Sequence, residues 1–167
     1  MVDNADPLVI TRVFDSPRER VWRAFTQAEH LTHWWGPKGL HLQVLKLELR
    51  PGGLFHYKMT TPNGQEMWGR FIYREIAAPE RMVFVVSFTD EAANPVRHPM
   101  SATWPLEVIN TLTLVEQAGT TILTLSGGPI NATEEEIETF LDGREGMQKG
   151  FAGTFDNLDA YLAEGWG

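Results

Sequence analysis

The sequence predicts an α+β fold in which a curved antiparallel sheet wraps around a long C-terminal helix. Hydrophobic residues alternate along the middle of the chain, at Phe55, Tyr57 and Met59 and again within 82–88. Side chains two positions apart share one face of a strand, so each run builds an apolar wall. Over 133–162 the hydrophobic period changes to that of a helix. A sheet bent around such a helix encloses apolar side chains, and we expect a hydrophobic cavity between the two rather than a polar catalytic floor.

Two short helices are expected directly after the first strand. Ser16 can cap the first of them, and Glu19 stands where a capping box requires a carboxylate. The second is expected over 29–35 and is ended by Gly36 and Pro37.

The remaining elements before the last helix are strands joined by turns rich in Pro, Gly and Asn. The strands are expected over 8–14, 40–49, 54–59, 66–76, 82–88, 106–116 and 120–126. A connection over 90–105 contains three prolines and is expected to be an irregular excursion. The order of elements predicts a sheet of mostly antiparallel neighbours and one domain spanning 1–167.

The C-terminal helix begins with a capping box formed by Thr133 and Glu136. Its apolar residues recur at helical spacing: Ile137, Phe140, Leu141, Met147, Phe151, Phe155, Leu158 and Leu162. A stripe of glycines runs beside that face: Gly143, Gly146, Gly150 and Gly153. Either the helix breaks or kinks within 143–146, because glycine is a poor helix former, or the stripe lets a ligand or another backbone approach closely.

Composition and charge limit the function. The 167 residues are 43% hydrophobic and 22% charged, which is ordinary for a globular protein. There is no cysteine, which excludes disulfides, thiolate metal sites and a cysteine nucleophile. The N-terminus does not resemble a secretory signal, and no apolar run reaches the roughly 20 residues of a membrane span, so we expect a cytoplasmic location. A net charge of −8 with scattered basic residues argues against nucleic-acid partners and membrane insertion.

Several motifs resemble the START-related SRPBCC superfamily, and within it the group named for the C-terminal domain of the activator of the heat-shock protein 90 ATPase. The motifs are Arg50-Pro51-Gly52-Gly53-Leu54-Phe55, Gly69-x-Phe71-x-Tyr73-Arg74-Glu75-Ile76, Pro79-Glu80-Arg81, Arg97-His98-Pro99-Met100, Thr103-Trp104-Pro105-Leu106-Glu107 and Gly150-Phe151-x-Gly153-Thr154-Phe155-Asp156-x-Leu158. The resemblance covers nearly the whole chain and implies the helix-grip (START- and Bet v-like) fold. The fourth and later motifs resemble a bacterial branch of the group.

The resemblance implies several functions and does not choose among them. Superfamily relatives bind lipids or hormones, or act as cyclases and hydroxylases on aromatic substrates. The group's name implies a chaperone partner and a role in stress. The activator that gave the group its name has a separate chaperone-binding domain, for which this chain has no room.

The residues that could carry chemistry are few. His30 and His33 have a spacing that two metal ligands can share, but no third ligand is identifiable, and we expect neither a metal nor a cofactor. Glu48, Glu75 and Glu107 lie in expected strands and would act as bases only if they pointed inward. No catalytic residue is therefore assigned.

The aromatic residues of the sheet and the last helix are the predicted ligand site. Trp34 and Trp35 are expected to divide between core and cavity rim, and His98 either packs its loop or overhangs the cavity. The expected lining is Phe55, Tyr57, Phe71, Tyr73, Phe84 and Phe88 from the sheet with Met147 and Phe151 from the helix, and Trp35, His98 and Trp104 nearer the mouth. Tyr57 and Tyr73 are the expected polar anchors, because a buried phenol needs a partner.

The function hypothesis is a binding protein for a small apolar or aromatic molecule. Two alternatives stay open: a cyclase- or hydrolase-type enzyme that uses the same cavity, and a module that binds a chaperone. A homodimer also stays open. Binding is preferred to catalysis because it needs only shape and one or two polar anchors, whereas an enzyme needs at least one inward ionisable pair.

Overall fold

The chain forms one antiparallel sheet that curves around its C-terminal helix. The computed structural model describes residues 8–36, 39–99 and 101–164. The elements are β1 (Leu8–Phe14), α1 (Arg18–Thr26), α2 (Ala28–Trp34), β2 (His41–Leu47), β3 (Leu54–Thr60), β4 (Glu66–Ala77), β5 (Arg81–Thr89), β6 (Val108–Gln117), β7 (Thr120–Pro129), α3 (Glu134–Asp142) and α4 (Arg144–Leu162). The seven strands follow the order β1-β7-β6-β5-β4-β3-β2. The architecture confirms the predicted helix-grip fold.

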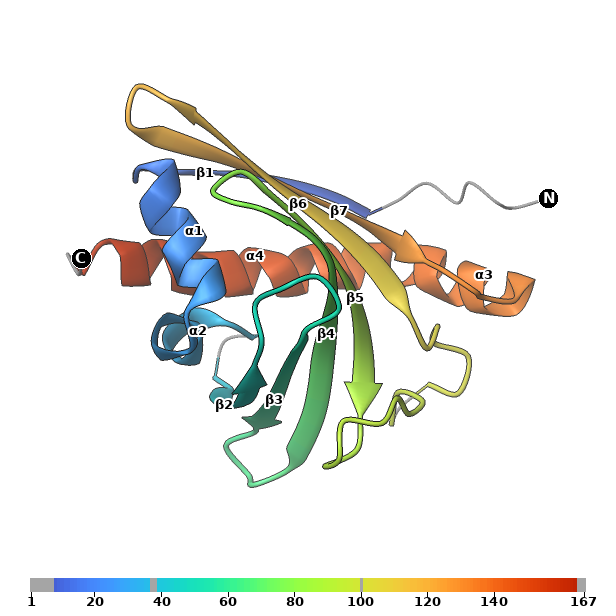
Figure 1. Cartoon of the computed structure of the whole chain (residues 1–167). Coiled ribbons are helices and arrows are strands. Elements are labelled where there is room, and N and C mark those ends of the chain that lie inside the picture. The colour runs from blue at the N-terminus through green and yellow to red at the C-terminus, as the bar shows by residue number, and fades with distance from the viewer. Residues whose placement is uncertain (1–7, 37–38, 100, 165–167) are drawn as a thin grey trace.

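The helices lie on the concave side of this sheet. Figure 1 shows α4 crossing the sheet, with α1 and α2 at one end of α4 and α3 at the other. The strand before α1 is β1, and it pairs with β7, which lies more than 100 residues later in the sequence. The concave face is therefore covered by different helices at its two ends, and this difference positions the candidate site.

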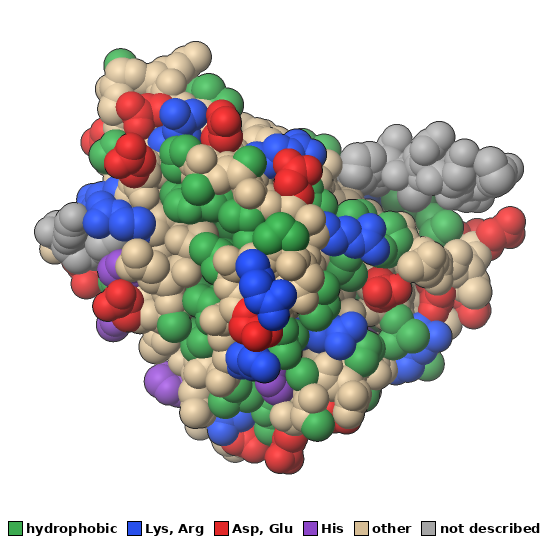
Figure 2. Space-filling view, in the orientation of Figure 1, with side chains coloured by type: hydrophobic (Ala, Val, Ile, Leu, Met, Phe, Trp, Pro, Cys, Tyr) green, Lys and Arg blue, Asp and Glu red, His purple; other side chains and the backbone are tan. Residues whose placement is uncertain are grey.

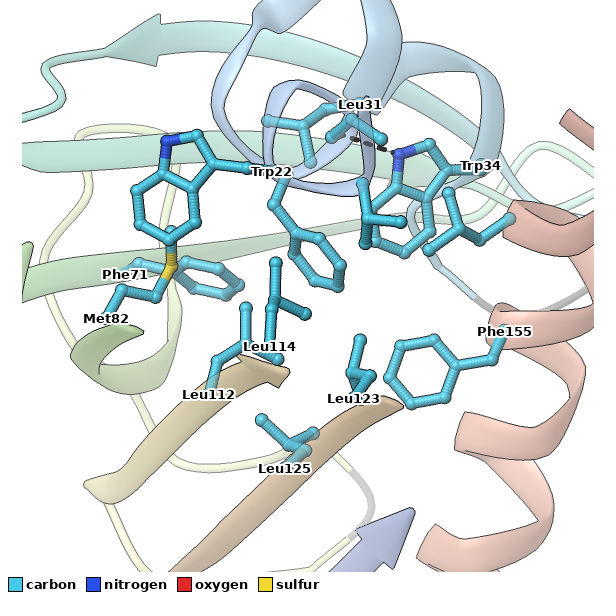
Figure 3. Packing of buried hydrophobic residues seen from close by; sticks show 14 of the residues in the cluster. Trp22, Leu31, Trp34, Phe71, Met82, Leu112, Leu114, Leu123, Leu125 and Phe155 are labelled. Carbon is cyan, nitrogen blue, oxygen red and sulfur yellow. Dashed lines mark hydrogen bonds between the residues drawn. The ribbon is translucent and has the colours of Figure 1, made fainter. Parts of the chain in front are cut away.

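The alternation of apolar residues sets which side chains face the helices. Met82 on β5 stands opposite Leu112 on β6, which in turn stands opposite Leu125 on β7, and all three side chains are buried. Figure 3 shows the leucines of β6 and β7 projecting toward Phe155 of α4. Two-residue alternation along neighbouring strands thus produces one continuous core, as predicted.

The start of α1 differs from the prediction. The N-cap is Pro17, and no side-chain cap is formed, so the expected capping box of Ser16 and Glu19 is wrong. Ser16 is instead buried, and its carbonyl accepts a 2.6 Å hydrogen bond from the hydroxyl of Thr121. The bond to β7 ties the connection between β1 and α1 to the sheet before the helix begins.

The two tryptophans at the end of α2, Trp34 and Trp35, differ in burial. Trp34 is buried, and its indole N–H donates a 2.9 Å hydrogen bond to the carbonyl of Ala24. Trp35 caps the C-terminus of α2 and is half-buried. The predicted helix stop is formed in part by Gly36, whose φ is +105°, and Pro37 lies outside the described residues.

The C-terminal helix is broken at Gly143, which confirms the predicted break within 143–146. Thr133 and Glu136 form the predicted capping box at the start of α3. Gly143, with φ −88° and ψ 0°, ends α3 and begins α4. The expected single helix is therefore two helices that meet at a glycine.

The outer face of the sheet is exposed at some positions and covered at others, since Val85 and Ser87 of β5 are buried there. Hydrophobic side chains are scattered there among charged and polar ones (Figure 2), and Val13 and Val115 are at least half exposed. No helix in the described part of the chain is both long and apolar enough to cross a membrane.

Candidate functional site

A pocket of about 160 Å³ lies between the concave face of the sheet and the helices α3 and α4. Its walls are almost entirely apolar. The lining residues are Leu8, Trp35, Phe84, Val86, Ser87, Phe88, Trp104, Pro105, Val108, Asn110, Leu125, Phe140, Met147 and Phe151. The pocket therefore draws on the strands β1, β5, β6 and β7, both C-terminal helices and the long connection before β6.

The helix break makes room for this pocket. A Cβ atom at Gly143 would lie 3.2 Å from the ring of Trp104, so the glycine allows that ring to pack against the junction of α3 and α4. At Gly146 and Gly150 the position of a Cβ atom is open space. Gly146 lines a hollow beside the pocket, and the missing side chain leaves that hollow wider, whereas Gly150 is exposed and lines neither space.

The long connection between β5 and β6 closes the pocket from one side. His98 packs edge-on against Phe88 with ring centroids 4.6 Å apart, and Trp104 packs against Phe140 of α3 at 5.6 Å. Arg97 donates to the backbone carbonyl of Trp104 at 3.2 Å. Its guanidinium also bonds the carboxylate of Glu136. These contacts fix the connection to α3 and hold Trp104 over the pocket.

A second hollow of about 340 Å³ lies beside the first and shares three lining residues with it. Its lining is Phe88, His98, Trp104, Gly143, Gly146 and Met147. We call this hollow the mouth. Burial lowers the pKa of His98 below its ordinary value, so His98 is a neutral imidazole at pH 7.

Six of the predicted site residues line the pocket. They are Trp35, Phe84, Phe88, Trp104, Met147 and Phe151. His98 lies at the mouth. The structure thus brings together residues from α2, β5, the long connection and α4 around one space.

The other four predicted residues do not line it, and this corrects the expected position of the cavity. Phe55, Tyr57, Phe71 and Tyr73 are each at most 5% exposed and belong to the packed core. Phe71 lies at the centre of that core and stacks on Phe84 with centroids 4.2 Å apart. It also meets Trp35 edge-on at 5.3 Å. The aromatic side chains at this end pack on one another and belong to the core instead of the pocket lining.

The two predicted tyrosine anchors therefore have other surroundings. Burial raises the pKa of Tyr57 to about 12, and a hydrogen bond from Trp35 opposes that shift. Burial raises the pKa of Tyr73 as well, and its hydroxyl has no hydrogen-bond partner among the described residues. Both phenols stay protonated in the core, and neither faces the pocket.

Sequence reasoning missed the polar group that does face the pocket, Asn110. It lies in β6 between Val108 and Leu112, in the alternating positions that face inward. A polar residue at an inward position of an apolar strand was the signal that could have found it. The prediction weighed only carboxylates and phenols as polar candidates.

The histidines and carboxylates considered for chemistry lie elsewhere. The ring of His33 stacks on Tyr161 at 5.0 Å, and His30 is 2.7 Å from the Tyr161 hydroxyl. No group of three potential metal ligands occurs within the described ranges. Of the three glutamates expected in strands, only Glu75 lies in one, because β2 ends at Leu47 and β6 begins at Val108. All three are outside the pocket lining. Glu48 is bonded to Arg50, Glu75 to Arg81 and Glu107 to Asn131.

Comparisons with known proteins agree on the fold. Protein Ms6760 from Mycobacterium smegmatis is 30% identical, with a TM-score of 0.78 over 95% of this chain and 91% of that one. A protein from Arthrobacter aurescens is 27% identical, with a TM-score of 0.80 over 96% and 88%. The AHSA1 protein from Silicibacter pomeroyi, at 19% identity and a TM-score of 0.68 over 94% and 97%, shares the fold. Curated protein sequences give no match.

The sequence also matches a family model described as Activator of Hsp90 ATPase homolog 1-like protein. The match extends over residues 15–163, from the end of β1 to the end of α4. The chain belongs to this family.

Proposed function

We propose that this protein binds one small apolar or aromatic molecule in the pocket between the sheet and the helices α3 and α4. The observation that supports the proposal most is the pocket itself. It is an apolar space of about 160 Å³ with Phe84, Trp104 and Phe151 in its walls. A cavity of about 150 Å³ in an apolar core is large enough for benzene, so the pocket fits a molecule with a single ring.

The character of the lining favours binding over catalysis. The lining side chains are apolar apart from Asn110 and Ser87, and neither ionises. A binding site requires shape and one or two polar groups; the apolar lining supplies the shape and Asn110 supplies a polar group. A cyclase or hydrolase would need an acid or a base within reach of its substrate.

The experiment is a titration with toluene followed by tryptophan emission and by the melting temperature. Trp35 and Trp104 line the pocket, so toluene that enters it should change the emission with saturable one-site behaviour. A ligand that binds only the folded state also raises the melting temperature as its concentration exceeds the dissociation constant.

Two variants of one strand provide the matched control. Val108→Phe places a ring inside the pocket, because Val108 lines it. Val115→Phe makes the same change on the same strand, at a position that is 50% exposed. The first should abolish saturable binding and the second should leave it intact. If wild type shows no saturable response, or both variants bind like wild type, the proposal fails.

The family's name supplies a separate candidate, stimulation of the Hsp90 ATPase. Its measurement is the rate of ATP hydrolysis by purified Hsp90 with and without this protein. Val108→Phe and wild type would stimulate that rate equally if a chaperone bound the outer surface rather than the pocket.

A further inference from the structure

The pocket contains one inward-facing polar side chain, that of Asn110. In the sheet Asn110 stands between Phe84 of β5 and Gly127 of β7. It is 7% exposed and lines the pocket. The other polar residue of the lining, Ser87, stands opposite Arg70 and alternates with Val86 and Phe88, so its hydroxyl projects from the opposite face of β5.

The amide of Asn110 has no hydrogen-bond partner within the residues that the structure describes. An amide offers two N–H donors and one carbonyl acceptor. The amide nitrogen and oxygen of Asn110 are open to the pocket, where water or a ligand can bond them. Packing alone does not require an amide here, since the neighbouring inward residues of β6, Val108 and Leu112, are apolar.

The neighbouring glycine gives the amide its room. A Cβ atom at Gly127 would lie 2.0 Å from the Oδ1 of Asn110 and 3.2 Å from the carbonyl oxygen of Ile109. Any side chain at position 127 would therefore displace the amide. Two residues on paired strands thus build one polar position in an apolar wall, and this position lies where the pocket meets β6.

The surroundings restrict the charge of a partner for this amide. No lysine, arginine, aspartate or glutamate belongs to the pocket lining. An ion moved into such a space loses its hydration and gains no opposite charge. A neutral group with a lone pair or an O–H bond, by contrast, can bond an amide without that loss.

We infer that Asn110 recognises an uncharged oxygen on the ligand, so that the pocket takes a neutral single-ring molecule with a hydroxyl or carbonyl group. This inference rests on the proposed function and names its ligand class. Shape and apolar contacts hold the ring, and the amide selects the oxygen.

The test compares phenol with toluene, which differ by a hydroxyl in place of a methyl group. Asn110→Leu keeps the number and branching of the side-chain heavy atoms and removes the amide. We expect this variant to bind phenol about threefold to tenfold more weakly than wild type does, the usual effect of one neutral hydrogen bond. Its affinity for toluene should be unchanged or higher, because the pocket has become more apolar.

Thr111→Val is the matched control, since Thr111 is the next residue of β6 and its side chain faces the other side of the sheet. It should change neither affinity. If Asn110→Leu alters the affinities for phenol and toluene by the same factor, the amide does not select the oxygen and the inference is overturned. Circular dichroism and the melting temperature establish that each variant is folded.

A second pair of probes tests the charge. Benzamide and benzoate have nearly the same shape, and we expect benzamide to bind at least tenfold more tightly near pH 7. Tighter binding of benzoate would overturn the neutral ligand class. If neither toluene nor phenol binds wild type saturably, the proposed function fails. If both bind and Val108→Phe blocks both, that function stands whatever Asn110→Leu shows.

Discussion

The two ends of the concave face contain similar side chains and differ in what covers them. At the end under α1 and α2, Phe55 meets Phe71 edge-on at 5.0 Å, and Trp34 meets Phe25 at 4.7 Å. We call this the packed end. At the end under α3, Phe88 and other aromatic residues surround an open space of about 160 Å³. We call this the hollow end.

The difference shows that aromatic strands alone do not make a cavity. At the packed end two short helices add large side chains, including Leu31 and Trp34, both 1% exposed. At the hollow end the helix breaks at Gly143, and Gly146 lines the mouth without a side chain. Whether the concave face is filled is therefore decided by the helices, because the sheet supplies rings at both ends.

The largest contrast is expected from two phenylalanines one turn apart on α4. Phe155 is 1% exposed and packs edge-on against Phe14 at 6.1 Å, whereas Phe151 is half-buried and lines the pocket. Phe155→Ala should lower the free energy of unfolding by about 3–5 kcal/mol through lost burial and a new cavity. Phe151→Ala should lower it by only about 1–2 kcal/mol, since part of its surface already faces open space. Urea denaturation measures both, and equal losses would contradict the distinction between the two ends.

A small residue can be tested at the packed end as well. Gly69 stands opposite Tyr57 in the sheet, and a Cβ atom there would lie 2.6 Å from the phenol oxygen. The ring of Tyr57 is buried and packs against Phe55 and Trp35. Gly69→Ala should therefore destabilise the protein by about 1–3 kcal/mol, as overpacking usually does. A thermal or urea transition equal to that of wild type would show that the packed end tolerates extra volume.

At the hollow end the cap of α3 should have a smaller effect. The hydroxyl of Thr133 accepts a 3.1 Å hydrogen bond from the backbone N–H of Glu136, and the Glu136 carboxylate accepts one from the Thr133 N–H at 2.9 Å. Thr133→Ala should lower the free energy of unfolding by about 1 kcal/mol. The measurement is urea denaturation at pH 7, and no loss would mean that α3 does not depend on its cap.

The same cap predicts a dependence on pH. The backbone N–H of Thr133 and then the guanidinium of Arg97 hold the pKa of Glu136 below its ordinary value of 4.5. This carboxylate therefore contributes stability that is complete above about pH 4.5 and is lost as the pH falls through the lower folded-state pKa. Glu136→Gln should reduce the loss of stability between neutral and acid pH. An unchanged acid profile in that variant would contradict the assignment.

The smallest expected effect is a gain. Gly146 lies in the first turn of α4, and a Cβ atom there would meet no other atom within 4 Å. Gly146→Ala should raise the free energy of unfolding by about 0.5–1 kcal/mol, because alanine loses less backbone entropy in a helix. A gain in stability for Gly146→Ala beside a loss for Gly69→Ala would show that the hollow end accepts an added methyl group and the packed end does not. A lower free energy of unfolding for Gly146→Ala would mean that the mouth has no room for a methyl group at this position.

The fold was predictable because its signals are local. Alternation in 82–88 and the capping box of Thr133 and Glu136 both follow from neighbouring residues, and the structure contains the strand Arg81–Thr89 and the capping box. The prediction for Ser16 was wrong because its position depends on a bond to Thr121, which is 105 residues away. A local pattern cannot contain a constraint that a distant strand imposes.

The site was predictable only in part, for a related reason. Alternation correctly placed both Phe71 and Phe88 on the concave face. It did not distinguish them, because what fills the space above each ring is set by helices that come from other parts of the chain. Asn110 was missed although its inward position could be derived from the same alternation, since the polar candidates considered were those able to ionise or to act as phenols.

The pairing of β1 with β7 also governs how the chain must assemble. Leu8 stands opposite Gly127, and Phe155 of α4 packs on Phe14. The first strand therefore has no partner during synthesis until β7 has left the ribosome, and the aromatic concave face has no cover until α4 follows. Contacts of such long sequence separation slow folding and leave hydrophobic surface exposed in the meantime. Nascent chains that stop short of α4 are the form of this protein most prone to aggregation.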